Sequence, residues 1–170
     1  RSVPVVNMTL LFNAGYSSDQ FSLPGVASMA GTMLTEGTKT RSSLQLSDQL
    51  ADLGATLRSN SDLDNSYLNL KALKSNFDAS LNLFTDVLLN PSFPKKDFER
   101  VQKEQLLKIK QEQARPVMMG LRILPRLLYG EGHAYNNPFT GSGTEQAVKK
   151  ITRDDLVKFH QTWFTPNNAN

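Results

Sequence analysis

Apolar side chains recur at every second position near the start of the chain. In residues 4–14 this alternation runs from Val6 to Phe12, and a period of two is the spacing of a β-strand with one buried face. Residues 55–60 and 65–72 predict two further strands, and the four residues between them fit a hairpin turn. The pattern therefore predicts three strands, two of them joined directly.

Apolar residues at helical spacing fill most of the remaining chain. The predicted helices are residues 24–35, 42–53, 75–90, 94–114 and 116–129 and a last helix that begins at residue 152. Ser42 and Gln45 fit a capping box, and Ser75 is predicted to cap the third helix. A loop rich in glycine and asparagine fills residues 130–143 and leads into a helix near Thr144.

Each helix is expected to turn an apolar face toward a common core. The predicted core residues are Met29 and Met33 in the first helix, Leu46, Leu50 and Leu53 in the second, Phe77, Leu81, Phe84 and Leu88 in the third, and Leu156, Phe159 and Trp163 in the last. The three strands are grouped and do not alternate strictly with helices. This order favours the α+β class, with an antiparallel sheet that helices cover on one face.

The composition fits one soluble domain. Hydrophobic residues make up 39% of the 170 and charged residues 21%, which is enough apolar material for one core, so residues 1–170 are taken as a single domain. The chain has no run of about 18 apolar residues, so no membrane span is expected. Basic residues are scattered among acidic ones, so no nucleic-acid partner is expected. The absence of cysteine excludes disulfides and thiolate zinc sites.

Few side chains indicate a site by themselves. His133 and His160 are the two imidazoles, and they do not share a helical face, so loop and packing roles are favoured over a metal site. The run Gly141–Thr144 could cradle a phosphate, but it lacks the G-K-[ST] signature, so a turn before a helix is favoured. Tyr16 and Tyr67 have two interpretations, which are peptide contact and ordinary packing on a strand face.

Five short motifs follow one another along the chain. They are a strand with an Ala-Gly turn at Pro4–Gly15, L-x-E-G-T-x-x-R-S at Leu34–Ser42, L-G-A at Leu53–Ala55, D-V-L-x-N-P-x-F at Asp86–Phe93 and F-x-P-x-N-A within Trp163–Ala169. In this order they resemble the pitrilysin/insulinase zinc metallopeptidases, the group that includes the mitochondrial processing peptidases. The resemblance covers nearly the whole chain. It implies the α+β fold of one metallopeptidase half, truncated at its C-terminal end.

The zinc site of that family maps onto residues of a different chemistry. Family members carry H-x-x-E-H on the helix that corresponds to residues 24–35, and here the two His positions fall on Ser28 and Thr32. The catalytic Glu position falls on Gly31, and the third ligand, a Glu about 75 residues beyond the second His, falls on Lys108. Zinc chemistry needs imidazoles and carboxylates at these positions. The resemblance therefore implies no catalytic residue, no metal and no cofactor in this domain.

Such a domain resembles the non-catalytic half of a duplicated peptidase or an inactive partner subunit. The resemblance implies a zinc-bearing catalytic half or subunit as the partner and an unfolded peptide as the substrate, which the two would enclose together. The candidate for holding that peptide by strand addition is the strand formed by Ala55, Thr56, Leu57, Arg58, Ser59 and Asn60. Two alternatives stay open. One is a purely structural subunit of the same fold, as in respiratory complexes, and the other is an independent enzyme that uses new residues, such as a serine–lysine pair of Ser28 and Lys108.

The two ends of the chain suggest a piece of a larger protein. The chain starts at Arg1 with no methionine and no signal-peptide pattern, and family members continue beyond their last motif. The resemblance favours the periplasm or cell envelope of a Gram-negative bacterium. Trp163 and Phe164 are expected to leave an exposed apolar surface that makes the isolated piece self-associate.

Overall fold

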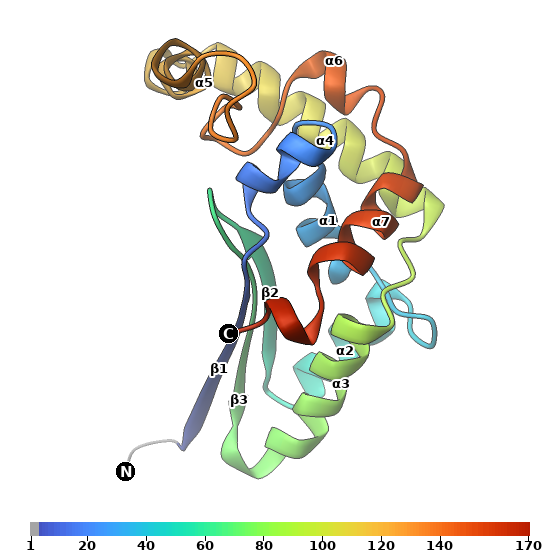
Figure 1. The fold of residues 1–170 in the computed structure, drawn as a ribbon. Helices are drawn as coiled ribbons and strands as arrows, with labels where there is room; N and C mark the ends of the chain where they lie inside the picture. The colour runs from blue at the N-terminus through green and yellow to red at the C-terminus, as the bar shows by residue number, and fades with distance from the viewer. Residues whose placement is uncertain (1–3) are drawn as a thin grey trace.

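A three-stranded antiparallel sheet forms one side of the molecule in the computed structural model, which describes residues 4–170 (Figure 1). Its strands are β1 (Val5–Phe12), β2 (Thr56–Ser61) and β3 (Ser66–Leu73), and β3 lies between the other two. Leu70 of β3 pairs with Met8 of β1 and with Leu57 of β2, so apolar side chains meet in a row across the sheet. The predicted antiparallel sheet is confirmed, and each strand ends within two residues of its predicted segment.

Helices fill the chain between and after the strands. They are α1 (Val26–Leu34), α2 (Ser43–Asp52), α3 (Phe77–Leu89), α4 (Lys95–Gln113), α5 (Pro116–Tyr129), α6 (Glu145–Val148) and α7 (Arg153–Trp163), with short 3-10 helices η1 (Tyr16–Phe21), η2 (Lys74–Asn76) and η3 (Pro166–Asn168). The predicted capping box at Ser42 and Gln45 is present, and it fixes the start of α2. Within residues 4–170, every helix is too short or too polar to cross a membrane.

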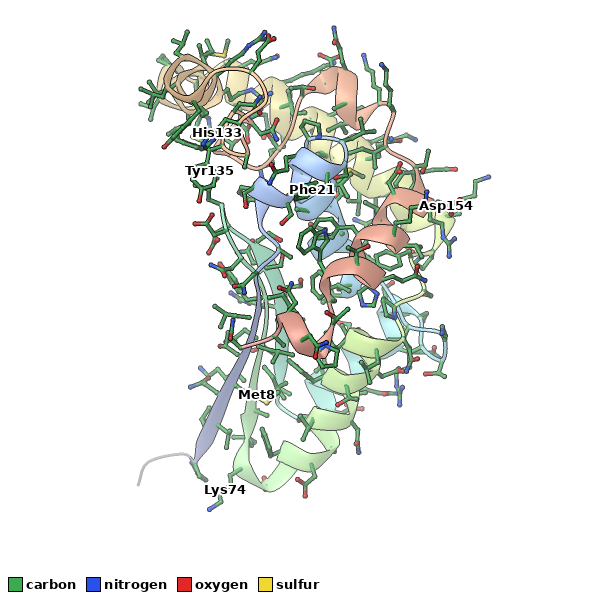
Figure 2. All side chains as sticks on the ribbon, in the orientation of Figure 1. Met8, Phe21, Lys74, His133, Tyr135 and Asp154 are labelled. Atoms are coloured by element: carbon green, nitrogen blue, oxygen red, sulfur yellow. The ribbon has the colours of Figure 1, made fainter. Side chains whose placement is uncertain are left out.

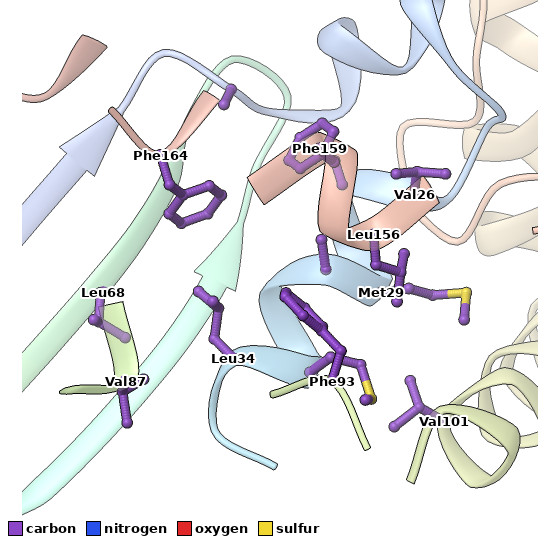
Figure 3. Packing of buried hydrophobic residues seen from close by; sticks show 14 of the residues in the cluster. Val26, Met29, Leu34, Leu68, Val87, Phe93, Val101, Leu156, Phe159 and Phe164 are labelled. Carbon is purple, nitrogen blue, oxygen red and sulfur yellow. The ribbon is translucent and has the colours of Figure 1, made fainter. Parts of the chain in front are cut away.

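The helices cover one face of the sheet, and the core lies between the two layers (Figures 1 and 3). Along β3, Leu68 and Leu70 are fully buried toward the helices, whereas Asn69 and Lys71 lie on the open face. Helix α1 runs through the middle of the helical layer and contacts α4, α7, β2 and β3. Its side chains are therefore buried on almost all sides, and both predicted core methionines, Met29 and Met33, are fully buried.

Two predictions for α3 are wrong in detail. Ser75 does not cap the helix, because residues 74–76 form the 3-10 helix η2 and α3 begins only at Phe77, after Asn76. The buried face is also rotated from the predicted one. Phe84 is buried as predicted, but its companions in the core are Ser80, Leu83 and Val87, whereas the three other predicted residues are half-buried. The small Ser80 side chain permits this rotation, because its hydroxyl donates a hydrogen bond to the Asn76 carbonyl within the helix.

The end of the described chain lies along the outer edge of β1. Asn170 and Leu11 exchange two backbone hydrogen bonds, at 2.9 and 3.1 Å. Phe164 packs on Phe12, with 4.6 Å between the ring centroids, and is only 8% exposed. The prediction of an exposed apolar surface is therefore wrong for Phe164, which belongs to the core. Trp163 is half-buried, and its ring lies 6.0 Å from that of Phe21, which is 72% exposed, so a small apolar patch does lie there. The large exposed apolar side chains gather on α5 instead.

Candidate functional site

A buried carboxylate sets the position of α1. Asp19, in η1, is 2% exposed, and its two oxygens accept hydrogen bonds from the amides of Gly25 (2.7 Å) and Ala27 (2.9 Å). These amides belong to the first turn of the helix, which has no other partner for them. Burial raises the pKa of the Asp19 carboxyl to about 7, although the two amide bonds act in the opposite direction. Helix α1 is thus anchored from outside, while Gly25 turns the chain into it with a φ of 107°.

Helix α1 lies close against β2, and Gly31 makes this approach possible. A Cβ atom at Gly31 would lie 3.1 Å from the Ser61 hydroxyl oxygen and 3.5 Å from that of Ser59. The first of these distances is tighter than ordinary van der Waals contact. A glutamate at this position would therefore need the Ser61 side chain to give way by a few tenths of an ångström.

A pocket of about 260 Å³ opens beside this contact, between α1 and α4, and is called the α1–α4 pocket below. It is lined by Tyr16, Ser28, Thr32, Ser59, Asn60, Ser61, Val101, Glu104, Gln105 and Lys108. Ser28, Thr32 and Lys108, three of the four residues at the family's zinc-site positions, thus lie around one pocket. The fourth, Gly31, lies on the same helix and faces Ser59 and Ser61 of the pocket wall.

The side chains of this pocket do not fit zinc. Ser28 and Thr32 supply hydroxyls and Lys108 supplies an ammonium, whereas structural and catalytic zinc sites use imidazole, thiolate and carboxylate ligands. The carboxylate of Glu104 lines the pocket, but both of its oxygens accept hydrogen bonds from Arg100. Among residues 4–170, no group of three or more His, Cys, Asp or Glu is placed to hold a metal ion.

The two histidines lie apart from this pocket. His133 stacks on Tyr129, with 4.8 Å between ring centroids, and Figure 2 shows it beside Tyr135 in the loop after α5. His160 packs edge-on against Phe93, and its Nε2 lies 2.7 Å from the Leu88 carbonyl oxygen. Burial lowers the pKa of His160, so its ring is neutral at neutral pH. His133 thus makes contacts within a loop and His160 makes packing contacts, the roles that the sequence favoured.

A match along most of the chain identifies the family. Residues 1–135 match the sequence profile of Insulinase (Peptidase family M16). The chain belongs to peptidase family M16. The fold and the positions around the α1–α4 pocket can therefore be compared with those expected for an M16 domain.

Named relatives cover the chain almost completely but are much longer. It is 23% identical over 156 residues to the non-peptidase homolog YmxG of Helicobacter pylori, and 24% identical over 169 residues to a probable mitochondrial-processing peptidase subunit beta of Arabidopsis thaliana. These matches cover 91% and 96% of this chain, and 35% and 30% of the relatives. The chain therefore spans about a third of the length of these proteins.

Two solved structures share the fold. One is a peptidase M16 inactive domain from Pseudomonas fluorescens, with a TM-score of 0.92 and 26% identity, which covers 99% of this chain and 40% of the other. The other is a protease from Helicobacter pylori, with a TM-score of 0.85 and 19% identity, which covers 97% of this chain and 40% of the other. The α+β architecture is thus that of a solved M16 inactive domain.

Strand β2, predicted to hold peptide, forms one edge of the sheet of this M16 domain. It pairs with β3 on one side, and no backbone–backbone hydrogen bond within residues 4–170 joins residues 56–61 to anything outside the sheet. At the end of this edge, the Ser61 carbonyl accepts a hydrogen bond from the Tyr16 hydroxyl and the Ser61 amide donates one to the Asn60 side chain. Of the six predicted residues, Ala55 is buried just before the strand, whereas Thr56, Arg58 and Asn60 are exposed. The last three residues of β2 line the α1–α4 pocket, so the open edge leads directly to it.

The sequence did not reveal one buried polar cluster of this M16 domain. Glu112 of α4 accepts hydrogen bonds of 2.6 Å from Arg122 of α5 and from the Ser142 hydroxyl, and Arg122 also donates to the Gly143 carbonyl. The run Gly141–Thr144 is thus bound to a carboxylate, which would repel a phosphate, so the favoured turn is the better interpretation. These partners lie 10 to 30 positions apart in sequence, and no local pattern connects them.

Other residues of the α1–α4 pocket had a weak signal in the sequence. Val101, Glu104 and Gln105 lie seven, four and three positions before Lys108 on α4, and residues at this spacing share a helix face. Tyr16 was considered from the sequence as a peptide contact or a strand-face residue, and it lies instead at the start of η1, where it lines this pocket. Its hydroxyl donates to the Ser61 carbonyl, and burial and the nearby Asp62 charge raise its pKa to about 12.

Proposed function

We propose that this chain is a catalytically silent M16 domain whose zinc site has been lost. The observation that carries the proposal is the α1–α4 pocket. The positions that correspond to the family's zinc ligands lie together around it, but they hold Ser28, Thr32 and Lys108. Two relatives support this view. One, similar in sequence, is named a non-peptidase homolog, and the other, similar in fold, is named an inactive domain.

The proposed role is to support proteolysis by a zinc-bearing half, in the same polypeptide or in a partner. The domain would form one wall of a chamber for unfolded peptide, and the edge of β2 would hold the peptide by strand addition. The open edge of β2 and its position next to the α1–α4 pocket support this role. We place the protein in the periplasm or cell envelope of a Gram-negative bacterium, which cell fractionation with a tagged protein tests.

Reconstitution tests the catalytic part of the proposal. The protein is purified alone and together with a zinc-bearing M16 polypeptide that carries H-x-x-E-H, and cleavage of an unfolded peptide is followed with and without a chelator. We expect no cleavage by the isolated chain and chelator-sensitive cleavage by the complex. Chelator-resistant cleavage by the isolated chain would contradict the proposal. Equal cleavage by the zinc-bearing polypeptide alone would favour the alternative of a purely structural subunit.

Hydrogen exchange tests the peptide-holding part. Unfolded peptide should slow exchange of the outward-facing amides of residues 56–61, because strand addition gives them acceptors. The amides of β3 serve as the internal control, since β3 is already paired on both sides. Unchanged exchange in β2 at saturating peptide would mean that its edge does not hold the peptide.

A further inference from the structure

We propose that α5 is the contact between two copies of this chain, which pack through this helix in antiparallel orientation. The helix lies at one end of the fold, and the residues that line the α1–α4 pocket come from other elements (Figure 1). The inference is therefore independent of the function proposed above. It commits to a second copy of the chain because the outer face of α5 is complementary to itself.

The outer face of α5 carries a row of apolar residues that the fold leaves exposed. Val117, Leu124 and Leu127 are 77%, 44% and 75% exposed. Together with the exposed Gly120 they follow one another at spacings of three, four and three positions, and this row is called the α5 seam below. Alternating spacings of three and four are those of helices that pack lengthwise against one another. Pro125 is the buried residue of the helix, so the seam faces away from the core.

The α5 seam fits a second seam that runs in the opposite direction. In such a pair, Val117 of one copy faces Leu127 of the other, and Gly120 faces Leu124. A Cβ atom at Gly120 would meet no other atom within 4 Å, so the space above this glycine is open. The Leu124 side chain of the second copy fills that space, and the two-fold axis repeats the contact. A parallel pair would place Gly120 against Gly120 and leave a void, which is unfavourable.

The charges at the two ends of α5 also favour the antiparallel orientation. Arg115 is exposed and belongs to none of the ion pairs formed among residues 4–170. In the antiparallel pair it comes close to Tyr129 and Glu131 of the other copy, and a guanidinium is attracted by an aromatic ring and by a carboxylate. In a parallel pair it would lie beside the same arginine of the other copy, and the two charges would repel each other.

The size of the apolar face fits a weak but specific dimer. The exposed apolar side chains of α5 present on the order of 600 Å² in each copy, whereas each partner of a standard interface buries about 800 Å². The face is thus near the lower end of the range for specific contacts. We therefore expect a dimer with a dissociation constant in the micromolar range.

A lipid surface fits this helix less well than a second copy does. Helices that lie in a membrane interface carry Lys and Arg on their polar face, where these side chains meet the lipid headgroups. Arg122 of α5 is bound instead to the buried Glu112, and Arg126 is paired with Glu131. The inner face of α5 is therefore used by the fold itself, which leaves an uncharged seam on the outside.

The natural absence of cysteine permits a direct test of the contact. The variants Gly120→Cys and Leu124→Cys are mixed in equal amounts at about 100 μM, above the expected dissociation constant, and equilibrated in a glutathione redox buffer. We expect the disulfide between the two different variants to exceed either homodimeric disulfide by about tenfold, because only positions 120 and 124 are close enough to be bridged. Leu44→Cys, on α2 and 69% exposed, is the control and should form no disulfide with Leu124→Cys.

The other arrangements and occupants give different results. Homodimeric disulfides in excess would indicate a parallel pair and would overturn the antiparallel contact. Sedimentation of the unmodified protein at the same concentration should give a dimer, and a monomer would overturn the proposal. For a monomer, binding to vesicles of phosphatidylglycerol and phosphatidylethanolamine would assign α5 to a lipid surface. Protection of Leu124→Cys from a maleimide by a zinc-bearing M16 polypeptide would assign it to that partner.

Discussion

Asp19 shows how a single side chain controls the position of the helix on which the site is built. Its carboxylate accepts two amide hydrogen bonds at the start of α1, in a place with almost no access to solvent. Burial raises its pKa to about 7, whereas the amide bonds favour the charged form. Near neutral pH, small changes in proton concentration therefore change the charge at this anchor.

We expect the free energy of unfolding to fall as the pH rises from about 4 to about 7. The folded protein holds the Asp19 proton with a pKa of about 7, whereas the unfolded chain releases it near the ordinary aspartate pKa of 3.8. The contribution is fully present below the unfolded pKa and is lost as the pH passes the folded pKa. Asp19→Asn should flatten this slope in urea unfolding, and Asp19→Ala should cost about 1–2 kcal/mol through the lost cap. A slope that is unchanged in Asp19→Asn would assign the pH dependence to other groups.

The residues of the α1–α4 pocket predict that the protein holds no stoichiometric zinc after zinc loading and desalting. The combined change Ser28→His, Thr32→His and Lys108→Glu should bring the content close to one zinc per chain, because all three positions line one pocket. Gly31 stays in this variant, since a Cβ there would crowd Ser61. Elemental analysis measures the zinc content of the unmodified protein and of the triple variant, and the single variant Thr32→His is the control. One tightly held zinc in the unmodified protein would contradict the proposed loss of the site.

At the scale of elements, α4, α5 and the loop before α6 are joined by the ion pair of Glu112 and Arg122. The side chains are only 4% and 9% exposed, and the N–O distance is 2.6 Å. Ser142 and Gly143 complete the cluster from the loop. Helix α5 packs mainly against α4, so this buried pair is one of the contacts that join it to the rest of the fold.

Replacing Arg122 by Met should lower the free energy of unfolding by about 3–5 kcal/mol, because it leaves the Glu112 charge buried without a partner. The double change with Glu112→Gln should recover part of the loss, since the unpaired charge is then removed. Arg126→Met is the matched control on the same helix. Its partner Glu131 is exposed, so a change of less than about 1 kcal/mol is expected. If urea unfolding gives the same decrease in unfolding free energy for Arg122→Met and Arg126→Met, the buried pair stabilises the fold no more than the exposed one.

The elements differ in how far the sequence could predict them. Helices α1, α2 and α7 followed from proline, capping residues and apolar spacing, which act within a few positions. The start of α3 could not be predicted in this way, because residues 74–76 can begin either an α-helix or a 3-10 helix. For the site, counting along the chain found Ser28, Thr32 and Lys108. The cluster around Glu112 and the contact of Tyr16 with β2 depend on tertiary packing, which no local pattern records.

At the scale of the whole molecule, α5 stands out as an apolar helix at one end of the fold (Figure 1). Its large exposed apolar residues are Val117, Leu121, Ile123, Leu124, Leu127, Leu128 and Tyr129. Elsewhere in residues 4–170 such residues are fewer, as with Leu44 on α2 and Phe21, which lies beside Trp163. A contiguous apolar surface of this kind is typical of contacts with another protein surface. We therefore place the tendency to self-associate on α5 and not at Trp163 and Phe164.

The isolated chain should self-associate through α5, and charge on its outer face should prevent this. Leu124 and Leu127 are 44% and 75% exposed, so Leu124→Lys with Leu127→Lys adds charge without disturbing the core. We expect this variant to raise the dissociation constant of self-association, measured by sedimentation, by at least about tenfold, because two apolar side chains leave the contact. Leu44→Lys changes an equally large and exposed side chain on α2 and should have no effect. If both variants associate like the unmodified protein, the contact lies outside α5. If the unmodified chain stays monomeric at high concentration, the apolar helix does not drive self-association.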